Sequence, residues 1–339
     1  MSDTFLKRLE NKVAQQLSSQ HVCYLLGAGA SYLNGKGYPL ATHLWELISK
    51  DVQSPYREEI QKKIENGADG IEHALDLLDD GQPVEKPHRH IVTEAIAKHF
   101  LSISAPLDAH RSFVRRLQAR NESSIPVFCL NYDGLLEKAA DVERLRLIDG
   151  FDGCESPFFS PSKFLELFAL PHRGLRRLQV SFRAGILHLY KLHGSLGWFE
   201  LEDGDVRKLG FGSSTPAKAK RLMIPPQHRK ALDTTAPPYS ALWSDLRGFL
   251  CHGPKLCNRL VSIGYGLRDE HLNPIIENAL IRKNFTFLVF AYELSENIFA
   301  RWSSKKNVIL VTKNRCSLYG EIGEGHPNHW DFERLSKEV

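Results

Sequence analysis

The sequence lacks two features that would place the protein at a membrane or outside the cell. No apolar run is long enough to span a bilayer, and the opening residues Met1-Ser2-Asp3-Thr4-Phe5-Leu6-Lys7 lack the apolar core of a signal peptide. We therefore expect a cytoplasmic protein with no membrane partner.

The chain of 339 residues also lacks a strong charge of either sign, because its formal net charge is only +4. A charge this slight gives no reason by itself to expect nucleic-acid binding. Hydrophobic residues make up 42% and charged residues 25% of the sequence, as is ordinary for a globular protein. The chain is therefore long and apolar enough for a large core.

The six cysteines lack the paired Cys-x-x-Cys spacing that a structural zinc site needs. Cys251 and Cys257 lie close together but have no such partners. Cys23 and Cys129 lie in apolar runs, where small buried hydrophobic residues are the ordinary interpretation. We therefore expect neither a disulfide nor a zinc ion, and we assign no metal ligand.

Short aliphatic runs at wide spacing are plentiful, and continuous runs of this kind are typical of strands buried on both faces of a parallel sheet. They occupy residues 21–26, 126–130, 186–192, 259–263, 285–291 and 307–311. The stretches between them show the helical spacing of apolar residues, as at Leu44, Leu47 and Ile48; at Ile71, Ala74, Leu75 and Leu78; and at Leu272, Ile275, Ile276 and Leu280. We expect an α/β fold, with a Rossmann-like, doubly wound and mostly parallel sheet.

The spacing of these runs also predicts how the domain is organised. About a hundred residues separate the first two runs, far more than an ordinary crossover connection. We interpret residues 51–122 as a helical insertion within a single domain, 1–339, and residues 150–184 as a second, irregular insertion. An opening helix, Thr4 to Leu17, either packs on the sheet or mediates assembly, and the sequence leaves both open.

Glycine or polar residues directly follow four of the predicted strands. They are Gly27-Ala28-Gly29-Ala30-Ser31, Asn131-Tyr132-Asp133, His193-Gly194-Ser195 and Gly264-Tyr265-Gly266. Open α/β sheets bind ligands at the carboxyl ends of their strands, so these turns are expected to meet at one crevice. A glycine turn between a strand and a helix directs backbone N–H groups at a phosphate. Tyr32 stands where a dinucleotide fingerprint has its third glycine, which disfavours an ordinary dehydrogenase.

Each of these motifs also has a purely structural interpretation. An Asn or Asp after a strand often forms a turn, and Asp133 is also a candidate cap for the next helix. A single His before Gly is often structural, and glycines after strands often only permit a tight turn. Their joint order at four strand ends is what favours a functional site.

In this order the motifs resemble the sirtuin superfamily (silent information regulator 2), and more closely its bacterial sirtuin-like NADase branch of anti-phage defence systems. The family patterns Gly-Ala-Gly-x-Ser, Thr-Gln-Asn-x-Asp, His-Gly and Gly-Tyr-Ser-x-x-Asp correspond here to Gly27–Ser31, Cys129–Asp133, His193-Gly194 and Gly264–Asp269. Ile224-Pro225-Pro226 is also similar to that branch. The resemblance covers roughly residues 20–315 and is carried by motif order in the predicted context.

The departures from the family pattern point away from acyl-lysine peptides as substrates. The two Cys pairs of the deacylating sirtuins are missing, and their Gly-Ile-Pro-Asp-Phe-Arg loop is replaced by Gly37-Tyr38-Pro39-Leu40. The Gln before the family Asn is Leu130 here. The pattern of the NAD site is nevertheless retained.

The resemblance implies that NAD is bound as a substrate, with no zinc. It implies two catalytic residues: Asn131, which would contact the nicotinamide ribose and an ordered water, and His193, a general base on a ribose hydroxyl. It further implies that Gly27, Ala28, Gly29 and Ser31 hold the pyrophosphate, that Asp133 lies near the carboxamide, and that Gly264 and Asp269 lie near the adenosine half.

The function expected from the resemblance is that of an NAD+ glycohydrolase, which releases nicotinamide and ADP-ribose. The chain would be the effector subunit of a bacterial anti-phage defence complex, held inactive until triggered. Its expected partners are further copies of itself and an operon-encoded protein, such as a ring-forming motor ATPase or an Argonaute-type protein, with nucleic acid reached only through the complex. The alternatives are an NAD-dependent protein deacylase, a non-catalytic NAD or ADP-ribose sensor module, and a nuclease acting within the complex.

Overall fold

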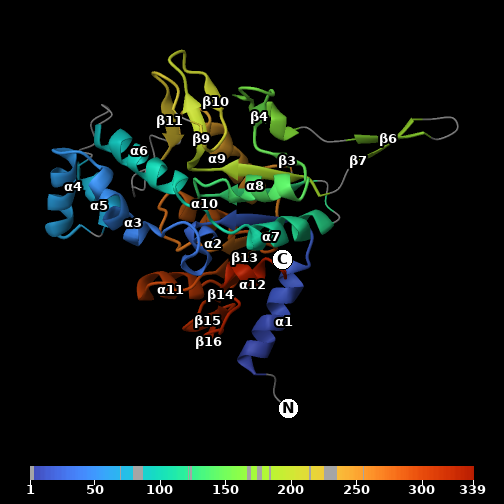
Figure 1. Ribbon diagram of the computed structural model, residues 1–339. Helices are drawn as coiled ribbons and strands as arrows, with labels where there is room; N and C mark the ends of the chain where they lie inside the picture. Colours follow the sequence, from blue (N-terminus) through green and yellow to red (C-terminus); the bar gives the residue numbers. More distant parts are fainter. Residues whose placement is uncertain are drawn as a thin grey trace.

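The computed structural model of the chain describes residues 4–68, 70–78, 87–120, 122, 124–165, 169–173, 178–182, 185–213, 215–224, 235–254 and 256–339. Within these ranges the centre of the molecule is a nine-stranded sheet in the order β16-β15-β14-β13-β12-β1-β2-β8-β3 (Figure 1). Its strands are β1 (Val22–Leu26), β2 (Ile125–Cys129), β3 (Leu147–Ile148), β8 (Leu187–Lys191), β12 (Arg259–Ile263), β13 (Thr286–Phe290), β14 (Val308–Val311), β15 (Arg315–Leu318) and β16 (Glu321–Glu324). All neighbours from β14 to β3 pair in parallel, and β15 and β16 are antiparallel.

The six predicted strands are confirmed, each within one residue of its expected bounds, as β1, β2, β8, β12, β13 and β14. Every residue of β1, β2 and β8 is buried. Burial on both faces is what their continuous apolar runs predict, because a strand that is solvated on one face alternates apolar and polar residues.

Helices account for most of the remaining described chain. They are α1 (Phe5–Leu17), α2 (Ala28–Tyr32), α3 (Ala41–Ile48), α4 (Tyr56–Glu65), α5 (Gly70–Leu78), α6 (Pro87–Leu101), α7 (Asp108–Ala119), α8 (Leu135–Val142), α9 (Tyr239–Arg247), α10 (Leu272–Ala279), α11 (Glu296–Ser303) and α12 (Phe332–Leu335), with short helical turns at Leu33–Gly35, Ser49–Asp51, Pro161–Leu165 and Gly248–His252. The predicted apolar faces at 71–78 and 272–280 are buried except at their last residues, Leu78 and Leu280, which are partly buried. The face at 44–48 was wrong by one residue, because α3 buries Trp45 and leaves Leu47 exposed.

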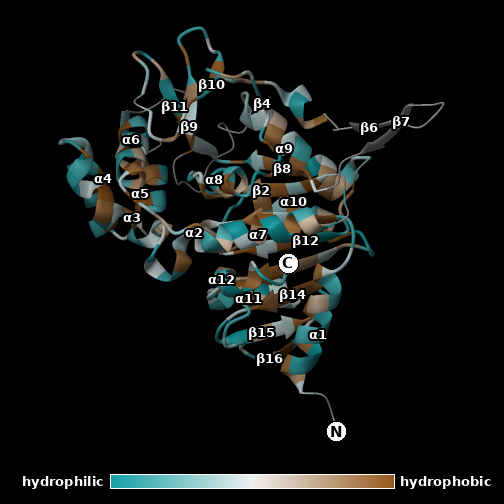
Figure 2. Cartoon of the chain, turned by 45° about the vertical axis from the view of Figure 1, so that its right-hand side comes forward, coloured by the Kyte–Doolittle hydropathy of each residue, from teal (hydrophilic) through white to brown (hydrophobic). Residues whose placement is uncertain are grey.

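The sheet carries a hydrophobic core on each face, as a doubly wound fold requires. Val22, Tyr24 and Leu26 of β1 belong to the core that includes residues of α1, α7 and α8. The alternate residues Cys23 and Leu25 belong to the core under α9, α10 and α11. Figure 2 shows the apolar strands between helices whose outer surfaces are hydrophilic. The predicted α/β, Rossmann-like, mostly parallel and doubly wound fold is confirmed.

Two smaller sheets accompany the central one. A five-stranded antiparallel sheet has the order β11-β9-β10-β5-β4, and β6 pairs with β7. Their bounds are β4 (Phe151–Asp152), β5 (Phe158–Phe159), β6 (Ala169–Arg173), β7 (Leu178–Phe182), β9 (Gly194–Glu200), β10 (Val206–Lys208) and β11 (Lys220–Met223). Of the segment 150–184, residues 166–168, 174–177 and 183–184 lie outside the described residues.

The opening helix α1 packs against the antiparallel end of the sheet. Thr4 caps it by accepting a hydrogen bond from the N–H of Lys7, and the buried face includes Leu9 and Val13. Arg8 Nη1 donates to the carboxylate of Glu321 in β16 at 2.9 Å. Of the two roles left open for this helix, the structure thus supplies contact with the sheet.

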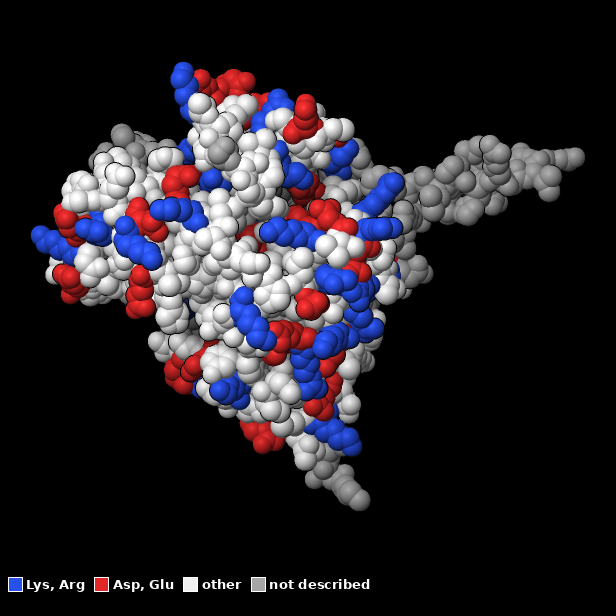
Figure 3. All heavy atoms as spheres, viewed as in Figure 1, with Lys and Arg blue, Asp and Glu red and all other residues white. Residues whose placement is uncertain are grey.

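The charged side chains on the surface are mixed in sign, as the small net charge of the sequence leads us to expect. Basic and acidic side chains are interspersed over the face in Figure 3. None of the described helices is long and apolar enough to cross a membrane.

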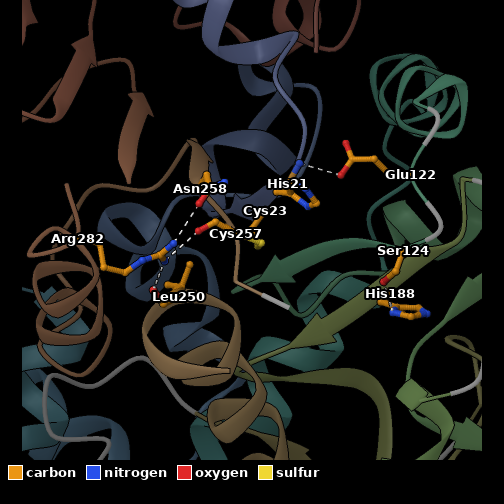
Figure 4. The surroundings of a disulfide bond; sticks show 9 residues. All are labelled: His21, Cys23, Glu122, Ser124, His188, Leu250, Cys257, Asn258 and Arg282. Carbon is orange, nitrogen blue, oxygen red and sulfur yellow. Dashed lines mark hydrogen bonds between the residues drawn. A yellow bond between two sulfur atoms is a disulfide. The ribbon is translucent and has the colours of Figure 1, made fainter. Parts of the chain in front are cut away.

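One expectation was wrong, because Cys23 and Cys257 form a disulfide (Figure 4). Cys23 lies in β1, and Cys257 lies two residues before β12, which pairs with β1 in a register that sets Cys23 beside Leu260. Arg282 donates to the carbonyls of Leu250 and Cys257, which braces the chain next to the bridge. The partners are 234 residues apart, so a search for nearby cysteines could not reveal the pair.

Candidate functional site

The four motif-bearing turns meet at one edge of the sheet, as expected. Strands β12, β1, β2 and β8 are neighbours in that order and run parallel, so their carboxyl ends lie together. From β1 the chain continues to β2 and β8 on one side, and β12 and β13 lie on the other. The strand order therefore reverses beside β1, which is where open α/β sheets form a ligand crevice.

A cavity of about 310 Å³ occupies this crevice. Eight of the nine predicted site residues line it: Gly27, Ala28, Ser31, Asn131, Asp133, His193, Gly264 and Asp269. The ninth, Gly29, packs against the turn after β12. The opposite wall comes from the segment after α2 and from α3, α5 and α6, including Tyr38, Ile71 and Phe100. Part of the segment 51–122 thus lines the cavity.

The glycine turns after β1 and β12 pack directly against each other. A side chain at Gly27 or Gly29 would come within 2.7 Å of Gly264 backbone atoms, and Gly264 itself has a φ of +67°. The N–H of Gly27 donates to the carbonyl of Ile263, and that of Gly29 to the carbonyl of Gly264, both at 2.9 Å. These two N–H groups are therefore engaged by protein carbonyls and are not available to a ligand.

Asn131 ties the turn after β2 to the turn after β1. Its Nδ2 donates to the carbonyl of Gly27 at 2.9 Å and to the Ser31 hydroxyl oxygen at 2.8 Å. These bonds fix the amide at the floor of the cavity, beside the residues predicted for the pyrophosphate. The neighbouring Tyr132 donates its hydroxyl to the carbonyl of Ile224. Pro225 and Pro226, the rest of that sequence motif, lie outside the described residues.

Asp133 has the capping role that its position after a strand also predicted. Its Oδ1 accepts the N–H of Leu135 at 3.0 Å, at the start of α8. The side chain is buried, and Oδ2 has no hydrogen-bond partner among the described residues. The cap and the cavity lining are compatible, because the two oxygens of one carboxylate can serve different neighbours.

His193 and Asp269 are brought together by the fold, although the resemblance implied a place near the adenosine half for Asp269. His193 Nε2 lies 3.1 Å from Asp269 Oδ2, and both side chains are more than nine-tenths buried. The His193 ring stacks against Trp243, with ring centroids 6.3 Å apart. A buried imidazole paired with a carboxylate is a common arrangement for proton transfer.

A buried ion pair that was not predicted from the sequence lies next to Asp133. Lys191, the last residue of β8, lies 3.2 Å from a carboxylate oxygen of Glu137 and also donates to the carbonyl of Asp133. Burial opposes the charge on Lys191, but the Glu137 carboxylate raises the pKa of that ammonium above its usual value. A charged residue at the end of an apolar strand was the signal that could have revealed it.

The cysteine near the site is not a candidate nucleophile. Burial raises the pKa of the Cys129 thiol to about 12, so the thiol stays protonated near neutral pH. Cys129 is the last residue of β2 and is buried in the core. The polar groups that line the cavity include the Asn131 amide, the His193 imidazole, the Ser31 hydroxyl, the Arg268 guanidinium and carboxylates.

The fold and the site define a doubly wound α/β protein with a ligand-sized crevice at its strand-order reversal. Solved structures with a similar fold include Sir2 homologues. A Sir2 homologue–NAD complex is 13% identical, with 97% of this chain and 91% of that chain covered and a TM-score of 0.44. A mutant Sir2 homologue with ADP-ribose is 11% identical (96% and 93% covered, TM-score 0.45), and another with 2′-O-acetyl ADP-ribose is 12% identical (96% and 93%, TM-score 0.44). No protein-family model and no curated protein sequence matches the chain.

Proposed function

We propose that the chain is an NAD+ glycohydrolase that cleaves NAD+ with water to give nicotinamide, ADP-ribose and a proton. The observation that carries the proposal is the convergence of Asn131, His193 and the Gly27–Ser31 turn on one cavity at the strand-order reversal. The sequence motifs from which the residues come support the same reading.

Two residues are proposed to perform the chemistry at the nicotinamide ribose. The bond to nicotinamide breaks through a transition state with oxocarbenium character, so the ribose must be held in one orientation. The Asn131 amide is fixed by Gly27 and Ser31, which suits it to orient the ribose and the attacking water. His193 would accept a proton from a ribose hydroxyl.

The dinucleotide phosphates are proposed to be met by Ala28, Ser31 and Arg268. Gly27 and Gly29 already donate their N–H groups to protein carbonyls. Among the described residues that line the cavity, Arg268 carries the one fixed positive charge, and it is exposed at the wall. A guanidinium suits the recognition of phosphate oxygens because it presents several donors in one plane.

Water is proposed as the acceptor because the sequence lacks the paired cysteines of the peptide-binding zinc module. A deacylase would instead transfer the ADP-ribosyl group to an acyl-lysine and accumulate O-acyl-ADP-ribose. The two reactions share nicotinamide as a product, so the second product distinguishes them.

The test is nicotinamide and ADP-ribose release from NAD+ by the purified chain, alone and with the product of the adjacent gene. Asn131→Ala and His193→Ala are each expected to lower kcat at least about 100-fold, as loss of an oriented catalytic group does. His252→Ala, at an exposed histidine outside the cavity, is the matched control and should retain wild-type turnover. Wild-type turnover in the Asn131 or His193 variants would refute the assignment.

We further propose that the chain works as the effector subunit of a bacterial anti-phage complex, as a homo-oligomer with an operon-encoded partner. The support is the motif resemblance, together with the harm that unrestrained NAD+ loss would cause a host. Light scattering of the chain alone and co-purified with the adjacent gene product measures the assembly. A monomer that degrades NAD+ at full rate without a partner would contradict this regulation.

A further inference from the structure

The two oxygens of the Asp269 carboxylate serve two different elements. Oδ1 accepts the N–H groups of His271 at 2.9 Å and Leu272 at 3.1 Å, at the start of α10. Oδ2 faces His193 Nε2 at 3.1 Å. One side chain therefore starts a helix after β12 and contacts the histidine that follows β8.

The loop around Asp269 is braced, so the carboxylate is held in place. The N–H of Asp269 donates to the Tyr265 hydroxyl oxygen at 3.0 Å, and that hydroxyl donates to Asn273 Oδ1 at 3.0 Å. Asn273 Nδ2 donates in turn to the carbonyl of Leu267 at 2.8 Å. Burial raises the pKa of Tyr265 well above its usual value, so its hydroxyl remains a donor near neutral pH.

An ionised carboxylate only accepts hydrogen bonds, so the proton between the two side chains belongs to His193 Nε2. In the neutral imidazole the lone pair is then on Nδ1. The tautomer is thus set by the contact of Nε2 with Asp269. Backbone donors to Oδ1 stabilise the Asp269 carboxylate as the anion. The pair thereby sets which nitrogen of the neutral His193 ring carries the proton, and it stabilises the imidazolium that forms when the ring takes up a second proton.

We propose that Asp269 is a positioning residue that sets the tautomer and basicity of His193, rather than a ligand of the adenosine half. This inference rests on the proposed NAD+ cleavage, because it assigns His193 the role of the base. Serine proteases have a comparable imidazole–carboxylate pair, made there through Nδ1, and an Asp-to-Asn change in it leaves the geometry intact and lowers kcat about 10⁴-fold.

The decisive variant is Asp269→Asn. Its amide oxygen can keep the bonds to His271 and Leu272, since Asn caps helices about as well as Asp. Its amide nitrogen would donate to His193 Nε2 and move the histidine proton to Nδ1. We expect kcat to fall at least about 100-fold with a shifted pH profile, while NAD+ affinity by calorimetry stays within about threefold. Asp331→Asn is the matched control, because Asp331 also caps a helix, at the N–H of Glu333, and does not line the cavity.

Nitrogen NMR of His193 provides a readout that does not depend on turnover. The wild type should show the Nε2–H tautomer and Asp269→Asn the Nδ1–H tautomer. If the wild type releases no nicotinamide, the proposed function fails. The NMR measurement then still tests, by itself, whether Asp269 sets the tautomer of His193. An unchanged tautomer, or an unchanged kcat and pH profile in Asp269→Asn, would overturn the inference.

Discussion

At the residue scale, His110 in α7 is a histidine buried without a close acidic partner. Its side chain is 1% exposed, its ring lies 4.8 Å from that of Phe332, and Nδ1 has no hydrogen-bond partner among the described residues. Burial lowers the pKa of His110 to about 4, and the charge of Asp133 opposes this only in part. His110 is therefore a neutral core residue rather than a second base.

This burial predicts a loss of stability on acidification. The unfolded chain takes up the His110 proton near its ordinary pKa of about 6.5, whereas the folded chain does so only at about 4. The contribution of His110 to the free energy of unfolding is fully present above the pKa of the unfolded chain. It falls by about 3 kcal/mol as the pH drops from that pKa to the pKa of the folded chain. In urea unfolding at about pH 7 and about pH 4.5, His110→Leu should lose about 2–3 kcal/mol less than the wild type does. His252→Leu, at an exposed histidine, is the control, and equal losses in wild type and His110→Leu would contradict the prediction.

At the scale of elements, the site depends on how closely the turn after β1 meets the turn after β12. Gly264 adopts a φ of +67°, and a Cβ there would lie 2.3 Å from the backbone nitrogen of Ala30. The contact is backbone against backbone, so no flexible side chain can move aside. The glycines after these two strands thus serve the packing of the crevice as much as any ligand.

Gly264→Ala is accordingly expected to lower the free energy of unfolding by about 2–4 kcal/mol and to abolish nicotinamide release. Gly266→Ala, two residues further on, is a matched control for stability, because its Cβ would meet only the Arg268 side chain, at 3.9 Å, and its φ is not positive. Because Gly266 itself lines the cavity, this variant is not a control for nicotinamide release. Urea denaturation with the release assay measures both effects. Equal stability of the two variants would contradict the packing argument.

At the scale of the whole molecule, the Cys23–Cys257 bridge joins β1 to the segment just before β12, and the strand order of the sheet reverses beside these two strands. It lies at their amino ends, at the opposite edge of the sheet from the cavity. Four other cysteines are free, and only Cys154 among them is exposed. The bridge therefore acts on the stability of the sheet rather than on the chemistry of the site.

Thiol titration of the denatured protein tests the bridge. We expect four thiols without reductant and six after reduction, and Cys154→Ser should lower both counts by one. Closing a loop of 234 residues stabilises the fold by up to about 5 kcal/mol in the chain-entropy model, so reductant should lower the melting temperature. Six thiols in the unreduced protein would show that the bridge does not form.

Much of the fold and of the crevice was predictable from the sequence. The apolar runs at 259–263 and 186–192 predicted buried strands. Parallel strands place their carboxyl ends at one edge of a sheet, so the turns after these strands were expected to lie near one another. Asp133 was predictable as a cap because it lies between a predicted strand and the next helix, close in the chain to the N–H group that it accepts. The hydrogen bond of Asn131 to the Gly27 carbonyl was not, because it depends on which strands are neighbours.

The sequence by itself determined the elements, since apolar runs and turn residues act over a few neighbours in the chain. Only the tertiary structure decided the pairings between distant segments: His193 with Asp269, Lys191 with Glu137, and Cys23 with Cys257. The physical reason is that these pairings follow from strand order, and strand order is set by packing across the whole sheet. The sequence therefore determined where the polar side chains stand along the chain, and the fold determined which of them meet.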